Sequence, residues 1–286
     1  MVPTEVTTVI TKFLNSKILN FKSVSGGSIN TAIKIETKER NYFLKLNNTA
    51  KYPQMFELEA RGLNLLRETN EIKIPNTIHI GNTENFSFLL LEWLESSIQS
   101  KNFWEIFGIS LAKLHQNTNV NFGLDHDNYI GSLKQYNTGK LDWASFFIEN
   151  RIEFQLRLAR NNQFVDKAIT SKFDSLFSIM DNIFPKEKPS LLHGDLWSGN
   201  FMADNNGNPC IFDPAAYFGH REMDIAMTKL FGGFNQEFYN SYNGEFKLEN
   251  GWEERIDICN LYPLLVHLNL FGQGYLTDIL RILKRF

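Results

Sequence analysis

Residues 191–200 read Leu-Leu-His-Gly-Asp-Leu-Trp-Ser-Gly-Asn, and residues 211–214 follow as Ile-Phe-Asp-Pro. Asn200 comes five residues after Asp195, and Asp213 comes thirteen after Asn200. In a phosphoryl-transfer site one carboxylate accepts the proton of the attacking hydroxyl, while a side-chain oxygen and a second carboxylate bind Mg²⁺. We therefore predict Asp195 as the catalytic base and Asn200 and Asp213 as ligands of Mg²⁺. The alternative, a Gly- and Asn-rich hairpin between two strands, does not explain why the polar residues of both turns can bind a metal.

The composition limits the class of protein. The chain has 286 residues, 43% of them hydrophobic, which suits one or two packed domains. Its net charge of −3 gives no general attraction for nucleic acid. Because Cys210 and Cys259 lie far apart and residues 1–16 lack the pattern of a secretory leader, we expect a cytoplasmic protein without disulfides. No membrane or nucleic-acid partner is expected, and the oligomeric state stays open with a monomer favoured.

The first 95 residues predict a small sheet with helices. Apolar residues at three- and four-residue spacings predict helices, and short apolar runs between turns predict strands. The expected helices cover 3–20 and 54–68, and the expected strands lie within 21–35 (two, joined by a glycine turn), 41–46, 71–80 and 86–94. This is a five-stranded antiparallel sheet with a helix, and we place the lobe boundary at about residue 95.

The rest of the chain, residues 96–286, predicts a larger and mainly helical lobe. The expected helices cover 103–116, 143–160, 164–184, 223–231 and 256–270. Residues 122–137 are rich in glycine, asparagine and aromatic residues and predict an ordered loop. The two parts together predict a two-lobed α+β fold.

The first strand pair carries a glycine-rich tip, Gly26, Gly27 and Ser28. Glycine lets the backbone approach a ligand, and the free N–H groups of such a turn can face phosphate oxygens. We therefore predict nucleotide contacts for these three residues. A plain hairpin turn is the alternative.

Lys45 lies inside an apolar strand, on the same face as Phe43. An unpaired buried ammonium is costly, so a lysine on this face needs a partner. Glu59 in the next expected helix is our choice for an ion pair that fixes Lys45 on nucleotide phosphates, and Glu57 is the alternative. The competing interpretations are a lysine that reaches solvent at a sheet edge and glutamates that favour the helix dipole.

The strand over 86–94 ends as Glu-Trp-Leu at the expected lobe boundary. An adenine ring can pair there with backbone groups of Glu92 and Leu94, which we include among the candidate nucleotide-binding residues. His115 closes the expected helix over 103–116, where we expect it to cap the helix or to pack near the catalytic loop.

In protein kinases the catalytic loop has the motif H-R-D-x-x-x-x-N, and the metal-binding motif is D-F-G. The His-Gly-Asp and Asp-Pro of this chain are more similar to the aminoglycoside- and choline-kinase-like group. Seven stretches, the first one quoted among them, are distinctive: Gly-Gly-Ser-Ile-Asn (26–30), Met-Phe-Glu-Leu-Glu-Ala (55–60), Asp-Asn-Tyr-Ile-Gly (127–131), Leu-Leu-His-Gly-Asp-Leu-Trp-Ser-Gly-Asn (191–200), Gly-His-Arg-Glu-Met-Asp-Ile-Ala-Met (219–227), Leu-Phe-Gly-Gly-Phe (230–234) and His-Leu-Asn-Leu-Phe-Gly-Gln-Gly-Tyr (267–275). With them the chain resembles the fructosamine kinase (ketosamine-3-kinase) family over nearly its whole length.

This resemblance implies a protein-kinase-like fold and an ATP- and Mg²⁺-dependent kinase. The implied substrate is a ketosamine, the adduct of a sugar on a free amine or a protein lysine, such as a ribulosamine or fructosamine. Members of the family phosphorylate the 3-hydroxyl of the sugar, and the phosphorylated adduct falls apart, which removes the glycation.

The resemblance also implies roles for single residues. It agrees with Asp195 as base, with Asn200 and Asp213 as metal ligands, and with Lys45 and Glu59 as the pair at the phosphates. The loop over the phosphates, residues 26–28, departs from the G-x-G-x-x-G of protein kinases. Asp224 is implied to hold the backbone of the catalytic loop. His220 and Arg221 fit a helix-start ion pair with Asp224 or a substrate role, and Trp197 fits a sugar-stacking or a core position.

Two rival functions stay open. One is a small-molecule hydroxyl kinase of the aminoglycoside, choline or homoserine type, although the sequence shows no cluster of acids for a cationic substrate. The other is a pseudokinase scaffold that binds nucleotide without turnover. The presence of the base, the lysine and both metal-ligand candidates argues against the scaffold.

Overall fold

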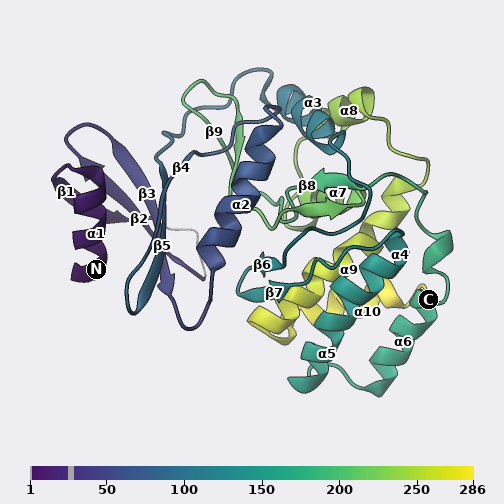
Figure 1. The fold of residues 1–286 in the computed structure, drawn as a ribbon. Helices are drawn as coiled ribbons and strands as arrows, with labels where there is room; N and C mark the ends of the chain where they lie inside the picture. Colours follow the sequence, from purple (N-terminus) through teal and green to yellow (C-terminus); the bar gives the residue numbers. More distant parts are fainter. Residues whose placement is uncertain (1, 25–28) are drawn as a thin grey trace.

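The computed structural model describes residues 2–24 and 29–286. A five-stranded antiparallel sheet forms its N-terminal part, with the strands in the order β1-β2-β3-β5-β4 (Figure 1). These strands are β1 (Ile18–Ser23), β2 (Thr31–Thr37), β3 (Asn41–Asn48), β4 (Thr77–Asn82) and β5 (Phe86–Glu92). The five strands predicted from the sequence are therefore present, and β3 lies at the centre of the sheet.

Helix α1 (Thr4–Leu14) covers one face of the sheet, where Val6 and Ile10 pack against Leu44. The prediction of a helix over 3–20 was wrong beyond Leu14. Asn15 adopts a left-handed backbone with φ of 46°, which ends the helix. Ile18 then starts β1 by pairing with β2.

Helix α2 (Met55–Glu68) covers the other face and lies between the sheet and the rest of the molecule (Figure 1). Its Phe56 and Leu63 share an apolar cluster with Leu89 and Leu91 of β5. Because side chains alternate along a strand, even-numbered residues of β3 face α1, and Lys45 faces α2.

The C-terminal part is mainly helical (Figure 1). Its helices are α3 (Phe103–His115), α4 (Trp143–Phe146), the π-helical segment Phe147–Ile152, α5 (Glu153–Asn161), α6 (Lys167–Phe177), α7 (Glu222–Leu230), α8 (Gln236–Glu245), α9 (Trp252–Phe271) and α10 (Leu276–Leu283), with short 3₁₀ turns at Met180–Asn182 and Gln273–Tyr275. Three strand pairs complete it: β6 (Asn128–Ile130) with β7 (Leu133–Gln135), β8 (Ser190–Leu192) with β11 (Tyr217–Gly219), and β9 (Phe201–Ala203) with β10 (Pro209–Ile211).

Two predicted elements of this part need correction. The segment predicted as a loop over 122–137 contains the β6–β7 hairpin. The helix predicted over 164–184 is shorter, because Asp166 caps α6 through the backbone N–H of Ile169 and α6 ends at Phe177.

One of the three apolar clusters of the described residues spans both parts. The cluster that holds α2 and β5 continues into α3 and α8 through aromatic rings, with Phe107 against Phe238 at 5.3 Å between ring centres. Residues 93–102 connect the parts without a helix or strand. The lobe boundary at about residue 95 falls in this connection and stays a prediction. Over residues 2–24 and 29–286, we find no helix whose length and hydropathy would let it cross a membrane.

Candidate active site

The His-Gly-Asp turn follows β8, and its backbone is held by hydrogen bonds to Asp224 of α7. The two carboxylate oxygens of Asp224 accept the backbone N–H groups of His193 at 2.7 Å and Gly194 at 2.9 Å. The role expected for Asp224 is therefore confirmed. Gly194 has φ of 81°, and a Cβ there would lie 2.2 Å from the carbonyl oxygen of Ala215. Only glycine fits this position, which explains the absence of an arginine at the centre of the motif.

Two buried side chains in turn orient Asp224. His115 at the end of α3 places Nε2 3.2 Å from Asp224 Oδ2, and its Nδ1 lies 2.7 Å from the hydroxyl of Tyr242 in α8. Burial acts to raise the pKa of Asp224, but the hydrogen bond and charge of His115 outweigh it and the pKa is lowered. Of the two roles expected for His115, packing near the catalytic loop is correct.

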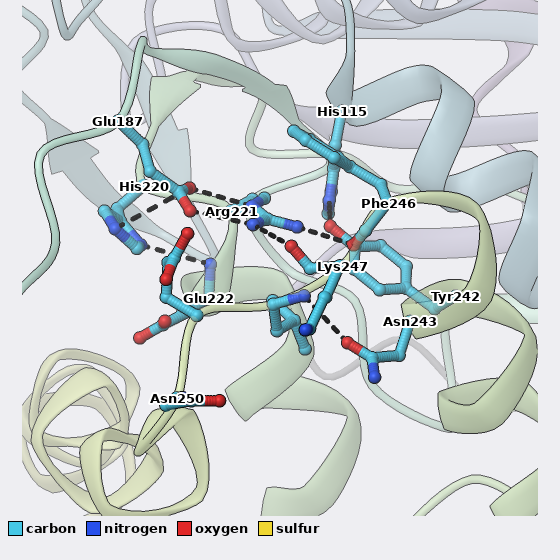
Figure 2. Close-up of polar contacts among 12 residues, drawn as sticks. His115, Glu187, His220, Arg221, Glu222, Tyr242, Asn243, Phe246, Lys247 and Asn250 are labelled. Carbon is cyan, nitrogen blue, oxygen red and sulfur yellow. Dashed lines mark hydrogen bonds and ion pairs between the residues drawn. The ribbon is translucent and has the colours of Figure 1, made fainter.

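Arg221 lies one turn before Asp224 and anchors the start of α7 (Figure 2). Its guanidinium donates twice to Glu187, at 2.8 and 2.7 Å, and also to the carbonyls of Phe246 and Lys247. The interpretations of Arg221 as the ion-pair partner of Asp224 or as a substrate contact were wrong. Its acid partner lies far away in sequence, just before β8, so the pair ties the strand that leads into the catalytic turn to the helix that holds the turn.

The Glu187–Arg221 pair predicts a pH-dependent stability. Burial acts to raise the pKa of Glu187, but the hydrogen bonds from Arg221 outweigh it and the pKa lies below its ordinary value of 4.5. A lowered pKa contributes stability above 4.5, and this contribution is lost as the pH falls through the folded-state pKa. We expect Glu187→Gln to lower the free energy of unfolding by about 3 kcal/mol at pH 7, because it leaves the buried Arg221 without a counterion.

Urea unfolding of both proteins between pH 3 and pH 8 measures this difference, which should shrink as the pH falls below 4.5. The matched control is Glu149→Gln, whose exposed pair with Lys140 is expected to contribute less than about 1 kcal/mol. A difference that does not change with pH would contradict the assignment.

Asp195 lies half-buried at the end of the turn, next to Asn200. The Asn200 amide donates to the backbone carbonyl of Asp195 at 2.8 Å and to its carboxylate at 3.0 Å. Burial and the charge of Asp213 raise the pKa of Asp195 well above its ordinary value. A raised pKa makes the carboxylate a better proton acceptor, as a general base requires.

Lys45 joins the sheet to the metal-binding turn. Its ammonium lies 2.7 Å from Glu59 Oε1 and 2.6 Å from Asp213 Oδ1. The predicted Lys45–Glu59 contact is confirmed, and the alternative partner Glu57 instead accepts a hydrogen bond from Asn82. Burial acts to lower the pKa of Lys45, but the two carboxylates outweigh it and the pKa is raised, so the lysine stays charged.

We expect Lys45→Ala to slow phosphate transfer about 100-fold, because a fixed positive charge would be lost from the phosphates. It should also lower the free energy of unfolding by about 3 kcal/mol, since the Glu59 side chain is only 11% exposed and would lose its counterion. Steady-state kinetics and urea unfolding measure the two effects. Lys22→Ala, on an exposed strand position, is the control.

A double variant separates the two effects. Lys45→Met with Glu59→Gln removes both charges, so it should regain most of the stability but not the turnover. Full turnover in Lys45→Ala would make Lys45 an ordinary strand lysine.

Asp213 and Asn200 offer the oxygen ligands that Mg²⁺ prefers. The amide nitrogen of Asn200 is used by Asp195, which leaves Oδ1 for a cation. Oδ1 of Asp213 contacts the ammonium of Lys45, and the Asp213 side chain is 38% exposed. The part of the chain that the structure describes holds no group of three or more His, Cys, Asp or Glu residues placed to bind a metal. The Mg²⁺ of a phosphoryl-transfer site needs fewer protein ligands, because phosphate oxygens and water complete its shell.

These residues line one cleft of about 810 Å³ between the sheet and the helical part. One end of the cleft lies at the end of β5 and is lined mainly by apolar side chains that suit a flat ring. The residues there are Val24, Ala32, Phe43, Glu92, Leu94, Met202 and Phe212. Glu92 and Leu94 therefore lie where the sequence placed them. The predicted phosphate loop, Gly26, Gly27 and Ser28, lies outside the described residues.

The other end of the cleft, beyond Asp195, is aromatic and apolar. Its walls carry Tyr129, Trp197, Met227, Phe231, Val266, His267, Leu270, Phe271 and Tyr275. Trp197 meets Phe231 edge to face at 6.3 Å between ring centres, so of its two interpretations the structure favours the cleft over the core.

The sequence did not indicate a role for His193 or for the pair Phe231 and His267, which the structure places in this site. His193 is buried, its Nε2 bonds the carbonyl of Phe212 at 2.9 Å, and burial lowers its pKa. It therefore acts as a neutral link between the two turns. Phe231 and His267 belong to the distinctive stretches 230–234 and 267–275. Nothing else in the sequence explained these two stretches, and this could have indicated that they line the cleft.

The comparisons with known proteins agree with this geometry. The family model described as fructosamine kinase matches residues 2–286. A probable ketoamine kinase of Enterococcus faecium is 40% identical over 279 residues, covering 96% of each chain. A chloroplastic protein-ribulosamine 3-kinase of Arabidopsis thaliana is 39% identical, covering 96% of this chain and 87% of the relative.

Solved structures show the same fold. A putative fructosamine-3-kinase of Haemophilus somnus superimposes with a TM-score of 0.87 at 32% identity, covering 98% of this chain and 96% of that one. A spectinomycin phosphotransferase, crystallised with ADP and spectinomycin, has a TM-score of 0.56 at 15% identity over 100% of this chain and 94% of its own. At that identity it supports the fold alone. The chain has the kinase-like α+β fold of these phosphotransferases and belongs to the fructosamine kinase family.

Proposed function

We propose that this protein transfers the terminal phosphate of ATP to the 3-hydroxyl group of a ketosamine. The observation that carries the proposal is the meeting of Lys45 and Asp213 at 2.6 Å in the same cleft as Asp195. A lysine from the sheet, a carboxylate for a cation and a carboxylate of raised pKa are the groups that this transfer uses. Family membership and the names of the relatives support the ketosamine as the acceptor.

In this proposal Asp195 orients the sugar hydroxyl and accepts its proton as the phosphoryl group leaves ATP. Asn200, bonded to Asp195 through its amide nitrogen, presents Oδ1 to Mg²⁺, and Asp213 presents its carboxylate. The bound Mg²⁺ neutralises charge on the phosphate oxygens. Lys45, held by Glu59, contacts the same phosphates.

Nucleotide binding is assigned to the sheet end of the cleft. The backbone groups of Glu92 and Leu94 pair with the adenine, and Gly26, Gly27 and Ser28 cover the phosphates. The Glu92 carboxylate accepts two hydrogen bonds from Asn76, which keeps it away from the adenine position and leaves recognition to the backbone. Membership of a kinase family supports ATP as the donor.

The ketosamine occupies the aromatic end, where Trp197 covers the sugar. Aromatic faces suit the apolar side of a sugar and the secondary ammonium of the adduct. Loss of the phosphorylated sugar then frees the amine, which makes the reaction a deglycation. The cytoplasmic location and the monomeric state stay predictions from the sequence.

A phosphate-transfer assay tests the proposal. Ribulosyl-lysine, fructosyl-lysine, a glycated peptide and a panel of aminoglycosides are each offered with ATP and Mg²⁺, and NMR of the product locates the phosphate. We expect transfer to the 3-position of a ketosamine. Transfer only to an aminoglycoside would support the rival kinase class, and ATP binding without turnover on any hydroxyl would support a scaffold.

A further inference from the structure

The stretch Asp-Asn-Tyr-Ile-Gly at 127–131 contributes Tyr129 to the wall of the cleft, and its Asn128 belongs to a buried polar network that the proposed reaction does not explain. Asn128 and Gln135 are paired residues of the β6–β7 hairpin and are 5% and 1% exposed. The Gln135 amide nitrogen donates to Asn128 Oδ1 at 2.8 Å, and the Asn137 amide donates to the same oxygen at 2.9 Å. Burying polar groups costs free energy unless they form hydrogen bonds, so a buried network of this size indicates a specific role.

The network ends on the backbone that follows Asp213. Gln135 donates to the carbonyl of Ala215 at 3.0 Å, and Asn128 donates to the carbonyl of Ala216 at 2.9 Å. Ala215 in turn donates its N–H to the carbonyl of His193 at 3.0 Å. The two side-chain amides therefore hold the short segment that joins the metal-binding turn to β11 and lies against the catalytic turn.

Two further residues fix the orientation of these amides. Tyr262 of α9 donates its hydroxyl to Gln135 Oε1 at 2.8 Å, so the Gln135 nitrogen must face Ala215. Arg151 donates to Asn137 Oδ1 at 2.8 Å, and its guanidinium lies 4.0 Å above the ring of Tyr217. Arg151 is fully buried, and over the described residues its guanidinium donates to carbonyl and amide oxygens and to no carboxylate. Each amide thus has one allowed orientation.

The segment needs such support because of its conformation. Asp213 has φ of 58°, a left-handed backbone that a non-glycine residue adopts at a cost and keeps only where its surroundings fix it. Lys45 holds the Asp213 side chain, but its ammonium does not hold the backbone. Hydrogen bonds to the carbonyls two and three residues later supply that constraint.

We propose that Gln135, with Asn128 and Tyr262, is a positioning residue that sets the place of Asp213 and so tunes the affinity for the metal–nucleotide complex. The inference rests on the proposed function, because it assigns Asp213 to Mg²⁺. Gln135 touches neither metal nor nucleotide and acts only through the backbone of Ala215.

The test compares Gln135→Leu with the parent protein by calorimetric titration of ADP, once with Mg²⁺ and once with EDTA. The dissociation constant in EDTA divided by the dissociation constant with Mg²⁺ gives a ratio that reports the contribution of the metal alone. We expect Gln135→Leu to reduce this ratio about tenfold and to leave the affinity in EDTA unchanged. A purely structural role would lower the melting temperature without changing the ratio.

Gln155→Leu is the matched control, because Gln155 is also 1% exposed and bonds Asn269, away from the metal-binding turn. It should destabilise the protein and keep the parental ratio. Tyr262→Phe removes one hydroxyl with little change in volume and serves if Gln135→Leu does not fold; its ratio should fall about threefold.

The outcomes separate the two proposals. A parental ratio in folded Gln135→Leu, or in Tyr262→Phe if the first variant does not fold, overturns this inference and leaves the proposed function intact. If Mg²⁺ does not strengthen ADP binding even in the parent protein, the assignment of Asp213 and with it the proposed function fails first.

Discussion

The Asp195→Asn variant should bind ATP about as tightly as the parent protein and lose about 1,000-fold in kcat. Asparagine has nearly the shape of aspartate, and the bond from the Asn200 amide to the backbone carbonyl of residue 195 does not depend on the side chain. The catalytic turn is held by Asp224 through the backbone of His193 and Gly194, so it should keep its form. What is lost is the group that accepts the proton of the sugar hydroxyl.

The pH dependence gives a second signature of Asp195. Burial and Asp213 raise its pKa above 3.8, so the acidic limb of the kcat/KM profile should lie above that value, and turnover should fall as the pH drops through it. The residual activity of Asp195→Asn should lack this limb.

Steady-state kinetics from pH 4 to pH 9 and a nucleotide titration measure both effects. Asp125→Asn makes the same chemical change at an exposed position and should behave like the parent protein. Turnover within tenfold of the parent in Asp195→Asn would show that the carboxylate is not the base.

Local periodicity explains why the nucleotide side of the site could be predicted. Lys45 could be assigned to a face because side chains alternate along β3, and Glu59 because it lies further into α2 than Glu57. The turn residues Asp195, Asn200 and Asp213 could be recognised because few arrangements use that order of polar groups. Each of these inferences depends on neighbours within one element or one motif.

Contacts between distant segments could not be predicted in the same way. Arg221 has an acid three residues later, the usual partner on a helix, but its guanidinium binds Glu187, which only the antiparallel pairing of β8 with β11 brings near. The boundary after Leu14 has a similar origin. The apolar residues of α1 and of β1 follow one another, and the left-handed Asn15 together with the pairing of Ile18 with Thr37 separates the helix from the strand.

The hairpin over 128–135 shows a further limit. Asparagine and glutamine in a Gly-rich stretch indicate a loop by composition, because their amides usually face water. Asn128 and Gln135 instead bond each other and the carbonyls of Ala215 and Ala216. A buried amide network leaves no periodic signal, so its members look like loop residues until the fold places their partners.

The Asp213→Asn variant should lose the strengthening of nucleotide binding by Mg²⁺ and about 1,000-fold or more in kcat. Asparagine tolerates the left-handed backbone that residue 213 adopts, with φ of 58°, so the turn should keep its form, whereas alanine would add backbone strain. Lys45 keeps Glu59 as a partner at 2.7 Å, and the 38% exposed side chain of residue 213 limits the cost of losing its charge. We therefore expect the free energy of unfolding to change by less than about 1 kcal/mol.

Titration of ADP with Mg²⁺ and with EDTA separates this effect from a general loss of binding. In the parent protein Mg²⁺ should strengthen binding at least about tenfold, a difference of about 1.4 kcal/mol, whereas in Asp213→Asn the two affinities should agree. Asp125→Asn is again the control and should keep the parental difference. If Asp213→Asn kept that difference, Mg²⁺ would have to be held elsewhere. The 2.6 Å contact with Lys45 would then serve only to neutralise a buried lysine.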